Sequence, residues 1–403
     1  MGFSARQAEE TENDMQFIDL GAQQKRIRNS LENNIKAVLD HGQYIMGPEI
    51  QRLEEKLAGY IKASFALSCA SGTDALLLAL MAYNVGPGDA IFTTPFTFVA
   101  TGEVINLLGA TPVFVDIDPL TYNIDPSKLE QTIAALKSES LDLHPLPKTS
   151  DVGRLRPRGV IAVDLFGLPP DYLRLEATAK KSGMFIIEDA AQSFGAEFQK
   201  KKACALADIG CTSFFPAKPL GCYGDGGMCF TDDKTLYDMM KSLRVHGKGT
   251  NKYDNVRVGI NGRMDTLQAA ILLSKFEIFA EEVELRQTVA DRYHQLLSGL
   301  EMITPPQVPA GVKSAWAQYS ILAKDETQRS QLQAKLKAAD IPTAVYYPKP
   351  LHLQTAYAPL GYKEGEFAIS EDCSRRIFSL PMHPYIAEED QMKIAEIIAN
   401  NGK

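Results

Sequence analysis

The strongest constraint on the fold is a regular alternation of short apolar runs and helical patterns between residues 66 and 230. Strands that alternate with helices are typical of a mostly parallel sheet covered by helices. The apolar runs are nearly continuous, as expected for strands buried on both faces. The predicted strands are Ala66–Ser71, Ala90–Thr94, Pro112–Ile117, Val160–Leu165, Met184–Glu188, Cys211–Phe215 and Met228–Thr231. The predicted helices are Asp74–Tyr83, Phe98–Leu108, Pro126–Leu136 and Asp171–Lys181.

The length of the chain predicts more than one domain. A chain of 403 residues is too long for one small core. We expect a large domain over residues 15–275, with a surface insertion at about 137–158 where prolines and charges interrupt the pattern. A long helical stretch over residues 264–300 connects it to a small α+β domain. Residues 276–403 are therefore expected to hold the connector helix and the small C-terminal domain. The elements predicted there are Trp316–Ala323, Thr327–Ala339, Thr343–Tyr347 and Glu388–Ala399.

Composition argues against several classes of protein. The net charge of −8 and the lack of a basic stripe argue against a nucleic-acid partner. No apolar run approaches the roughly 18 residues that span a bilayer, and the polar residues 1–14 lack the core of a signal peptide and are expected to be a disordered tail. The six cysteines form no CxxC pair, which favours reduced thiols over a metal site. We therefore expect a cytoplasmic protein without a membrane, nucleic-acid or metal partner.

An acid and a lysine indicate the chemistry. Asp189 follows a buried strand, at the edge where open α/β sheets bind ligands. Lys218 follows another strand 29 residues later, between two prolines that exclude a regular helix. Pyridoxal phosphate (PLP) needs a lysine that binds its aldehyde and a carboxylate that keeps its pyridine nitrogen protonated. Asp189 alone could equally be a helix cap, but the two together favour PLP. Gln192 is placed to donate a hydrogen bond to the cofactor's phenolic oxygen.

A phosphate site is predicted where the first strand meets the first helix of the alternating region. Helix N-termini bind anions through free N–H groups, which makes Gly72 and Thr73 candidates, and Ser213 could add its hydroxyl. An isolated turn of this kind caps a helix about as often as it binds a phosphate. Phe98 follows the next strand, and the sequence leaves open whether it stacks on the pyridine ring or packs in the core.

These stretches together resemble the DegT/DnrJ-type sugar aminotransferases, a branch of the fold-type-I PLP enzymes. The matching segments are SGTDAL (71–76), TPFTFVAT (94–101), VDLFG (163–167), EDAAQSFGA (188–196), SFFPAKPLGCYGDGG (213–227), LRVHG (243–247) and GINGRMDTLQAA (259–270). The resemblance runs from about Phe17 to the C-terminus and leaves out the tail and the insertion.

The resemblance implies a PLP-dependent aminotransferase with PLP covalently bound to Lys218 and with Asp189 as the partner of the pyridine nitrogen. It implies contacts to the cofactor from Gly72, Thr73, Phe98, Asp189, Gln192, Ser213, Lys218 and Asn261. Asn261 matches a residue that reaches the phosphate of the neighbouring subunit, which implies a homodimer with shared active sites. Some relatives dehydrate sugars and carry histidine at the lysine position, so Lys218 favours transamination.

Residues 40–50 and 213–227 resemble the aminotransferases that act on UDP-2-acetamido-2-deoxy-3-oxo-glucuronate. Those enzymes take nitrogen from L-glutamate and build 2,3-diamino sugar acids for bacterial surface polysaccharides such as the lipopolysaccharide O-antigen. Arg263 and His352 are candidates for binding the negative charges of the substrate. Arg263 could instead cap the connector helix, and His352 could be a loop histidine with its own partner. Two alternatives stay open: an aminotransferase for a 3- or 4-oxo-6-deoxy nucleotide sugar, and a PLP-binding sensor or regulator without turnover.

Overall fold

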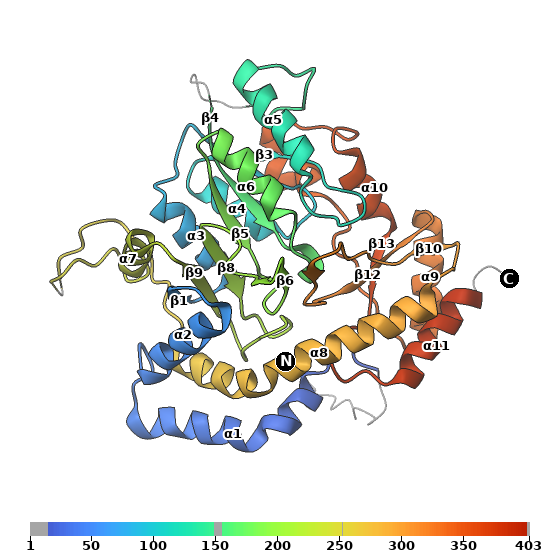
Figure 1. Cartoon of the computed structure of the whole chain (residues 1–403), viewed down its shortest axis with the longest axis horizontal. Helices are drawn as coiled ribbons and strands as arrows, with labels where there is room; N and C mark the ends of the chain where they lie inside the picture. The colour runs from blue at the N-terminus through green and yellow to red at the C-terminus, as the bar shows by residue number, and fades with distance from the viewer. Residues whose placement is uncertain (1–14, 149–154, 252, 401–403) are drawn as a thin grey trace, which may run out of the picture.

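A seven-stranded sheet forms the centre of the molecule in the computed structural model, which describes residues 15–148, 155–251 and 253–400 (Figure 1). The strand order is β1-β9-β8-β5-β4-β2-β3. Strand β9 runs antiparallel to β1 and β8, and the other pairs are parallel. The predicted mostly parallel sheet is confirmed. Its strands are β1 Phe65–Cys69, β2 Asp89–Thr93, β3 Thr111–Phe114, β4 Arg156–Val163, β5 Phe185–Asp189, β8 Ile209–Ser213 and β9 Gly227–Thr231.

Helices cover both faces of this sheet because successive strand residues point to opposite sides. Ile161 and Ile187 pack with the helices of one face, whereas Val160 and Ile186 pack with those of the other. The first face carries α3 Gly72–Ala82, α4 Val99–Leu107 and α7 Lys234–Leu243; the second carries α5 Pro126–Ser138 and α6 Tyr172–Lys181. The four helices predicted in this region are confirmed within a few residues at their ends.

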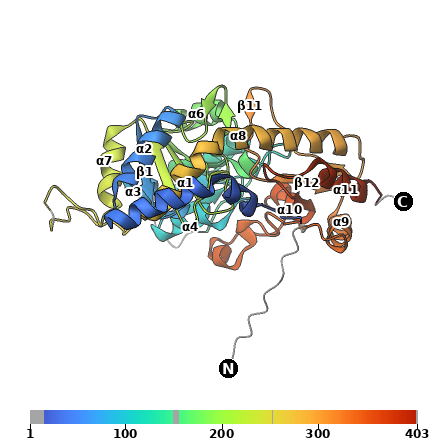
Figure 2. The ribbon, with the colours of Figure 1, turned by 90° about the horizontal axis from the view of Figure 1, so that it is seen from below.

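A long helix, α8 Thr266–Leu297, runs beneath the sheet, and α1 Leu20–His41 packs along it (Figures 1 and 2). Helix α2 Pro48–Ile61 also packs on α8 and buries Ile50, Leu53 and Leu57. The sequence analysis predicted α8 but not α1 or α2. The boundary expected at residue 275 lies inside α8, and the division into two domains remains a prediction.

The C-terminal part has a core of its own, built around the buried residues Tyr293, Tyr319 and Phe378. Its elements are β10 Ile303–Thr304, β12 Tyr319–Ala323, α9 Glu326–Ala338, α10 Ala368–Arg376, β13 Ile377–Leu380 and α11 Glu388–Ala399. The element expected at Thr343–Tyr347 is wrong: only a single bridge from Ala344 to Ser379 forms there. The sheet strand is Ile377–Leu380 instead, which the sequence analysis did not identify.

Two predicted segments lie partly or wholly outside the description. The tail over residues 1–14 is outside the described residues, as are 149–154 of the predicted insertion. The insertion is also shorter than expected, because α5 continues to Ser138 and β4 begins at Arg156. No helix in the described ranges is long and apolar enough to cross a membrane.

Candidate active site

The carboxyl ends of adjacent parallel strands bring the predicted site residues together. Val163 at the end of β4 is in register with Asp189 at the end of β5, and Asp189 is in register with Cys211 of β8. The segments that follow β5 and β8 therefore start at one edge of the sheet, as the ligand-binding edge of an open α/β sheet requires. Gln192 and Lys218 lie on these two segments.

Asp189 is held in one orientation by two hydrogen bonds. Its side chain is buried, and Thr101 Oγ1 donates to Oδ2 over 2.7 Å, whereas the Ala191 N–H donates to Oδ1 over 3.3 Å. Burial raises the pKa of this carboxyl, and both hydrogen bonds and the charge of Lys218 oppose that change. The site thus holds a carboxyl group with unused lone pairs close to the Lys218 amine.

Lys218 lies in an irregular turn after β8, without helical structure, as its two proline neighbours predicted. Its N–H donates to the Phe215 carbonyl over 2.9 Å, and a side chain at Gly221 would place Cβ only 2.5 Å from the Pro216 carbonyl oxygen. Burial lowers the pKa of the Lys218 amine, and the attraction of Asp189 partly offsets this. Its Nζ makes no hydrogen bond to any described residue, so it is free to bind a ligand.

An anion cradle forms at the start of α3. The Ser71 side chain accepts from the Asp74 N–H over 3.0 Å, and the first helical hydrogen bond is donated by Ala75. The N–H groups of Gly72 and Thr73 precede that bond and have no partner within the described chain. A Cβ on Gly72 would lie 2.6 Å from Ser213 Cβ, so only glycine lets the serine approach this helix end. The three predicted phosphate ligands therefore lie together.

Gln192 is buried and uses both ends of its amide. Its Oε1 accepts from the Phe166 N–H over 2.6 Å, and its Nε2 donates to Tyr347 OH over 3.2 Å. The amide nitrogen keeps a second hydrogen for a ligand. The ring of Tyr347 lies 6.3 Å from that of Phe98, centroid to centroid, and Phe98 is 54% exposed. This exposure favours a ring available for stacking over one packed in the core.

The sequence analysis missed Thr101, Phe166 and Tyr347. Thr101 is the last residue of segment 94–101, which the sequence analysis used only for the family resemblance. Its position one helical turn after Thr97 indicates a polar contact near the strand ends. Tyr347 lies 155 residues from the glutamine that it contacts, so no local pattern predicts the contact.

The three remaining candidates have different surroundings. Asn261 is exposed and lies beside Gly262, whose carbonyl accepts from the Ala70 N–H over 3.0 Å near the start of α3. Arg263 is half-buried, and its Nε is buried without a partner among the described residues. His352 is buried, with Nε2 3.0 Å from Glu371 Oε1, and burial lowers its pKa. This placement favours the alternative of a histidine with its own structural partner.

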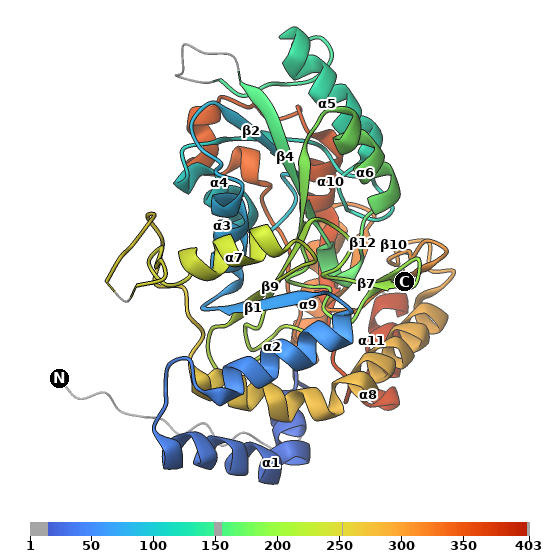
Figure 3. The same cartoon turned by 60° about the vertical axis from the view of Figure 1, so that its left-hand side comes forward.

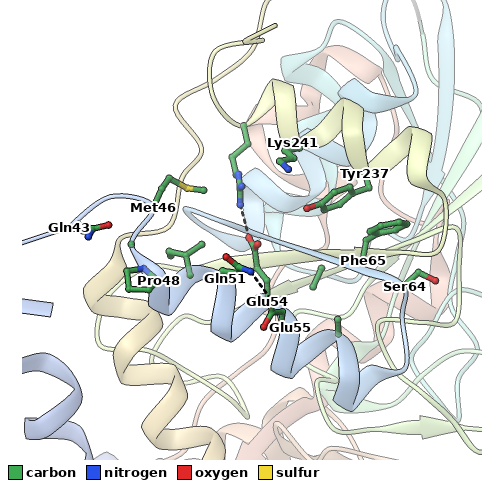
Figure 4. Close-up of a pocket in the computed structure, with 15 residues that line it drawn as sticks. Gln43, Met46, Pro48, Gln51, Glu54, Glu55, Ser64, Phe65, Tyr237 and Lys241 are labelled. Atoms are coloured by element: carbon green, nitrogen blue, oxygen red, sulfur yellow. Dashed lines mark hydrogen bonds and ion pairs between the residues drawn. The ribbon is translucent and has the colours of Figure 1, made fainter. Parts of the chain in front are cut away.

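A separate hollow of about 710 Å³ lies between α2 and α7, at the outer edge of β1 (Figure 4). Arg244 is 2% exposed and donates to Glu54 over 2.8 Å and to the Ser68 carbonyl over 2.6 Å. The Ser68 N–H donates to the same carboxylate over 2.8 Å. The ion pair therefore satisfies the open edge of β1, which protects an edge strand from pairing with another chain. No predicted site residue lines this hollow.

Comparisons with known proteins agree with the geometry of the site. Residues 25–399 match the family model described as the DegT/DnrJ/EryC1/StrS aminotransferase family. The UDP-2-acetamido-2-deoxy-3-oxo-D-glucuronate aminotransferase of Pseudomonas aeruginosa is 46% identical over 92% of this chain and 96% of its own length. A DegT DnrJ EryC1 StrS aminotransferase from Brucella abortus is 49% identical, with a TM-score of 0.90 over 96% of this chain and 100% of that one. NtdA from Bacillus subtilis, solved with its cofactor PMP, is 26% identical, with a TM-score of 0.82 over 96% and 83%.

The residues present fit the cofactor of this family. A buried carboxyl group, a lysine amine and a helix N-terminus whose first N–H groups have no partner among the described residues are the donor set that PLP requires. The predicted fold class, enzyme class and family are confirmed, and the chain belongs to the DegT/DnrJ/EryC1/StrS aminotransferase family.

Proposed function

We propose that this protein transfers the amino group of L-glutamate to UDP-2-acetamido-2-deoxy-3-oxo-glucuronate, in the synthesis of a 2,3-diamino sugar acid for a bacterial surface polysaccharide. The observation that carries the chemistry is that the buried Asp189 carboxyl and the buried Lys218 amine lie close enough to influence each other's pKa, with the N-terminus of α3 at the same edge of the sheet. The choice of substrate is supported by the 46% identical Pseudomonas aeruginosa enzyme, which matches over nearly the whole of both chains.

PLP is the cofactor, and its parts correspond to the groups at this sheet edge. When bound, PLP carries the amino group on its aldehyde carbon. Its ring accepts electrons while the carbon of the donor or acceptor loses or gains a proton. Lys218 would bind the aldehyde, Asp189 would hold the proton on the pyridine nitrogen, and Gln192 would donate to the phenolic oxygen. The N–H groups of Gly72 and Thr73 and the hydroxyl of Ser213 would hold the phosphate.

Lys218 has a second role once glutamate has displaced it. Burial lowers the pKa of its amine, so a larger fraction of it is neutral near pH 7 than in an exposed lysine. As a neutral amine, Lys218 would take the proton from the glutamate carbon and pass it to the aldehyde carbon of PLP, and it would move a proton in the opposite direction when the keto sugar is aminated. The Thr101 and Ala191 hydrogen bonds favour the charged form of Asp189, the form that would hold the proton on the pyridine nitrogen.

We also propose a homodimer in which Asn261 reaches the partner's phosphate site. The loop that follows α7 projects from the body of the molecule and leads to Asn261 (Figure 3). Two apolar side chains on it, Val256 and Val258, are 53% and 88% exposed. The loop between α1 and α2 adds Ile45, which bridges to Asp265 and is 50% exposed. Exposed apolar side chains of this kind are typical of an interface between subunits.

Two further expectations belong to this proposal. Arg263 follows Asn261 closely and has a buried Nε without a partner in the described chain, so it is the better candidate for a charge of the substrate. The six cysteines are all buried and unpaired, which supports a cytoplasmic location.

Absorbance spectroscopy tests the proposal in two steps. The visible band of the lysine-bound cofactor should be bleached by glutamate and should return when UDP-2-acetamido-2-deoxy-3-oxo-glucuronate is added. If the band returns only with a 4-oxo-6-deoxy nucleotide sugar, the substrate assignment is wrong but the protein is still an aminotransferase. Failure of glutamate to bleach the band would overturn the amino donor, and absence of the band after incubation with PLP would overturn the function itself.

A further inference from the structure

A pair of carboxyl groups lies directly behind Asp189 and has no role in the chemistry described so far. Asp164 follows β4 and Glu188 precedes Asp189 in β5, and both side chains are 0% exposed. Glu188 is in register with Ala162, so Asp164, two residues further along the chain, lies on the same face of the sheet, and each carboxyl influences the pKa of the other. Asp164 also accepts from Tyr172 OH over 2.7 Å and from Ser193 Oγ over 2.5 Å. The pair is therefore inaccessible to solvent, and each oxygen of Asp164 accepts a hydrogen bond.

Glu188 completes the pair from the other side. It accepts from the backbone N–H groups of Cys204 and Leu206, over 2.5 and 2.9 Å. These bonds favour a charged Glu188, whereas a contact between two carboxyl oxygens needs a proton between them. Two carboxylates in contact cannot both be ionised in a buried site. The geometry thus allows one proton and one negative charge for the pair.

No cation is among the described groups that influence the pKa values of the pair most. Burial raises the pKa of both carboxyls. After burial, the groups that influence the Asp164 pKa most are Ser193, Tyr172, Glu188 and Asp189, and none of these is a cation. The titratable groups that face the pair are Tyr172 of α6, the Cys204 thiol from the turn after β7 Lys201–Lys202, and Asp189 of β5. A negative charge on the pair would therefore act on Asp189 without compensation from any of the described groups that influence the pair most.

Asp164 also connects the turn after β4 and the turn after β5, which together position Gln192. The Asp164 N–H donates to the Asp189 carbonyl over 3.1 Å, and the turn that Asp164 begins carries Phe166, whose N–H donates to Gln192. Ser193, bonded to Asp164, directly follows Gln192 in the chain. One carboxyl therefore ties together the turn after β4 and the turn after β5.

We propose that Asp164 and Glu188 share one proton and act as a positioning pair for Asp189 and Gln192, with the remaining negative charge strengthening the hold of Asp189 on the proton of the pyridine nitrogen. This inference rests on the proposed function, because it assigns the pair a role towards PLP. A negative charge close to Asp189 raises the proton affinity of the group that Asp189 contacts.

The shared proton is tested by infrared spectroscopy of the holoenzyme. A protonated carboxyl has a carbonyl stretch that a carboxylate lacks and that shifts in D₂O. The wild-type protein should show one such band from this pair, and both Asp164→Asn and Glu188→Gln should lose it because the remaining carboxyl gives up the proton. Labelling aspartate or glutamate with ¹³C in the wild-type protein assigns the band if a variant does not fold. No band, or two bands, would overturn the shared proton.

The effect on the cofactor is tested by ¹⁵N NMR of labelled PLP, whose pyridine nitrogen shift reports its protonation. Each single variant keeps one negative charge and should titrate close to the wild-type protein. The double variant Asp164→Asn/Glu188→Gln removes the charge and should lose the pyridine proton at a pH lower by about one unit. An unchanged midpoint in the double variant would overturn the electrostatic role. If PLP does not bind the wild-type protein, the proposed function fails, whereas the infrared result on the pair still stands.

Discussion

Two regions of the molecule each bring a buried acid close to a buried base, and they differ in how many hydrogen bonds these groups make. At the edge of β1, Glu54 accepts from Arg244 and from the Ser68 N–H and hydroxyl, and Arg244 also holds the Ser68 carbonyl. At the carboxyl edge of the sheet, Lys218 makes no side-chain hydrogen bond within the described residues, and Asp189 keeps lone pairs free.

The comparison shows that the hollow between α2 and α7 is not the place where the candidate active-site residues lie. The satisfied pair lines the hollow of about 710 Å³, and the unsatisfied pair lies outside it. Buried charged groups that already have partners contribute to the stability of a fold, because removing one partner leaves the other charge buried and unpaired. Buried groups without partners are costly to keep and mark the places where a ligand completes the structure.

The largest effect is expected for Lys218→Ala. Loss of the amine removes both the attachment of PLP and the proton carrier, so turnover should fall by a factor of about 10⁴ or more. Transamination assays with Lys241→Ala provide the matched control, since Lys241 lines the hollow and is exposed. Equal loss in both variants, or retained turnover in Lys218→Ala, would contradict the assignment.

Asp189→Asn should be the next most damaging change. A neutral amide cannot hold the pyridine proton, and we expect turnover to fall by about 10² to 10³, which corresponds to roughly 3–4 kcal/mol. Steady-state kinetics of the variant reconstituted with PLP measure this. Glu55→Gln neutralises an exposed acid in the hollow and should leave turnover unchanged.

Arg244→Ala should affect stability and not chemistry. It leaves Glu54 without its cation and the Ser68 carbonyl without its donor, which costs roughly 3 kcal/mol for a buried pair. Urea denaturation measures the loss, and the turnover of the folded fraction should equal that of the wild-type protein. A variant that is as stable as the wild-type protein but has impaired turnover would contradict the assignment of Arg244 to stability.

Thr101→Val should have the smallest effect of the four. Removing the hydroxyl frees Asp189 Oδ2 from its 2.7 Å hydrogen bond and should lower turnover about tenfold. Thr101→Ser keeps the donor and should restore most of the activity. If valine and serine behave alike, the hydrogen bond does not orient Asp189.

The residues that could be predicted from the sequence are those that follow strands. Asp189, Ser213 and Lys218 were identified because apolar runs indicate strands, and parallel strands end at the same sheet edge. Helix α1 was missed, although its buried residues Ile27, Leu31 and Val38 keep helical spacing. A search for that spacing outside the alternating region would have predicted it.

Contacts made across long separations could not be predicted in this way. The position of Tyr347 against Gln192 depends on the packing of the C-terminal part, and no local pattern records it. His352 was proposed for the substrate because histidines bind anions, but burial beside Glu371 and Phe367 is decided by tertiary packing. The roles of all these site residues towards cofactor and substrate remain predictions.

The pairing of β1 with β9 has a consequence for synthesis on the ribosome. Strand β1 ends at Cys69, just before the turn that holds Gly72 and Thr73, yet its sheet neighbour spans Gly227–Thr231. A nascent chain must therefore emerge past about residue 231 before the first strand gains its partner. Contacts so distant in sequence form slowly. The phosphate cradle, although encoded early, can be completed only after more than half of the protein has been translated.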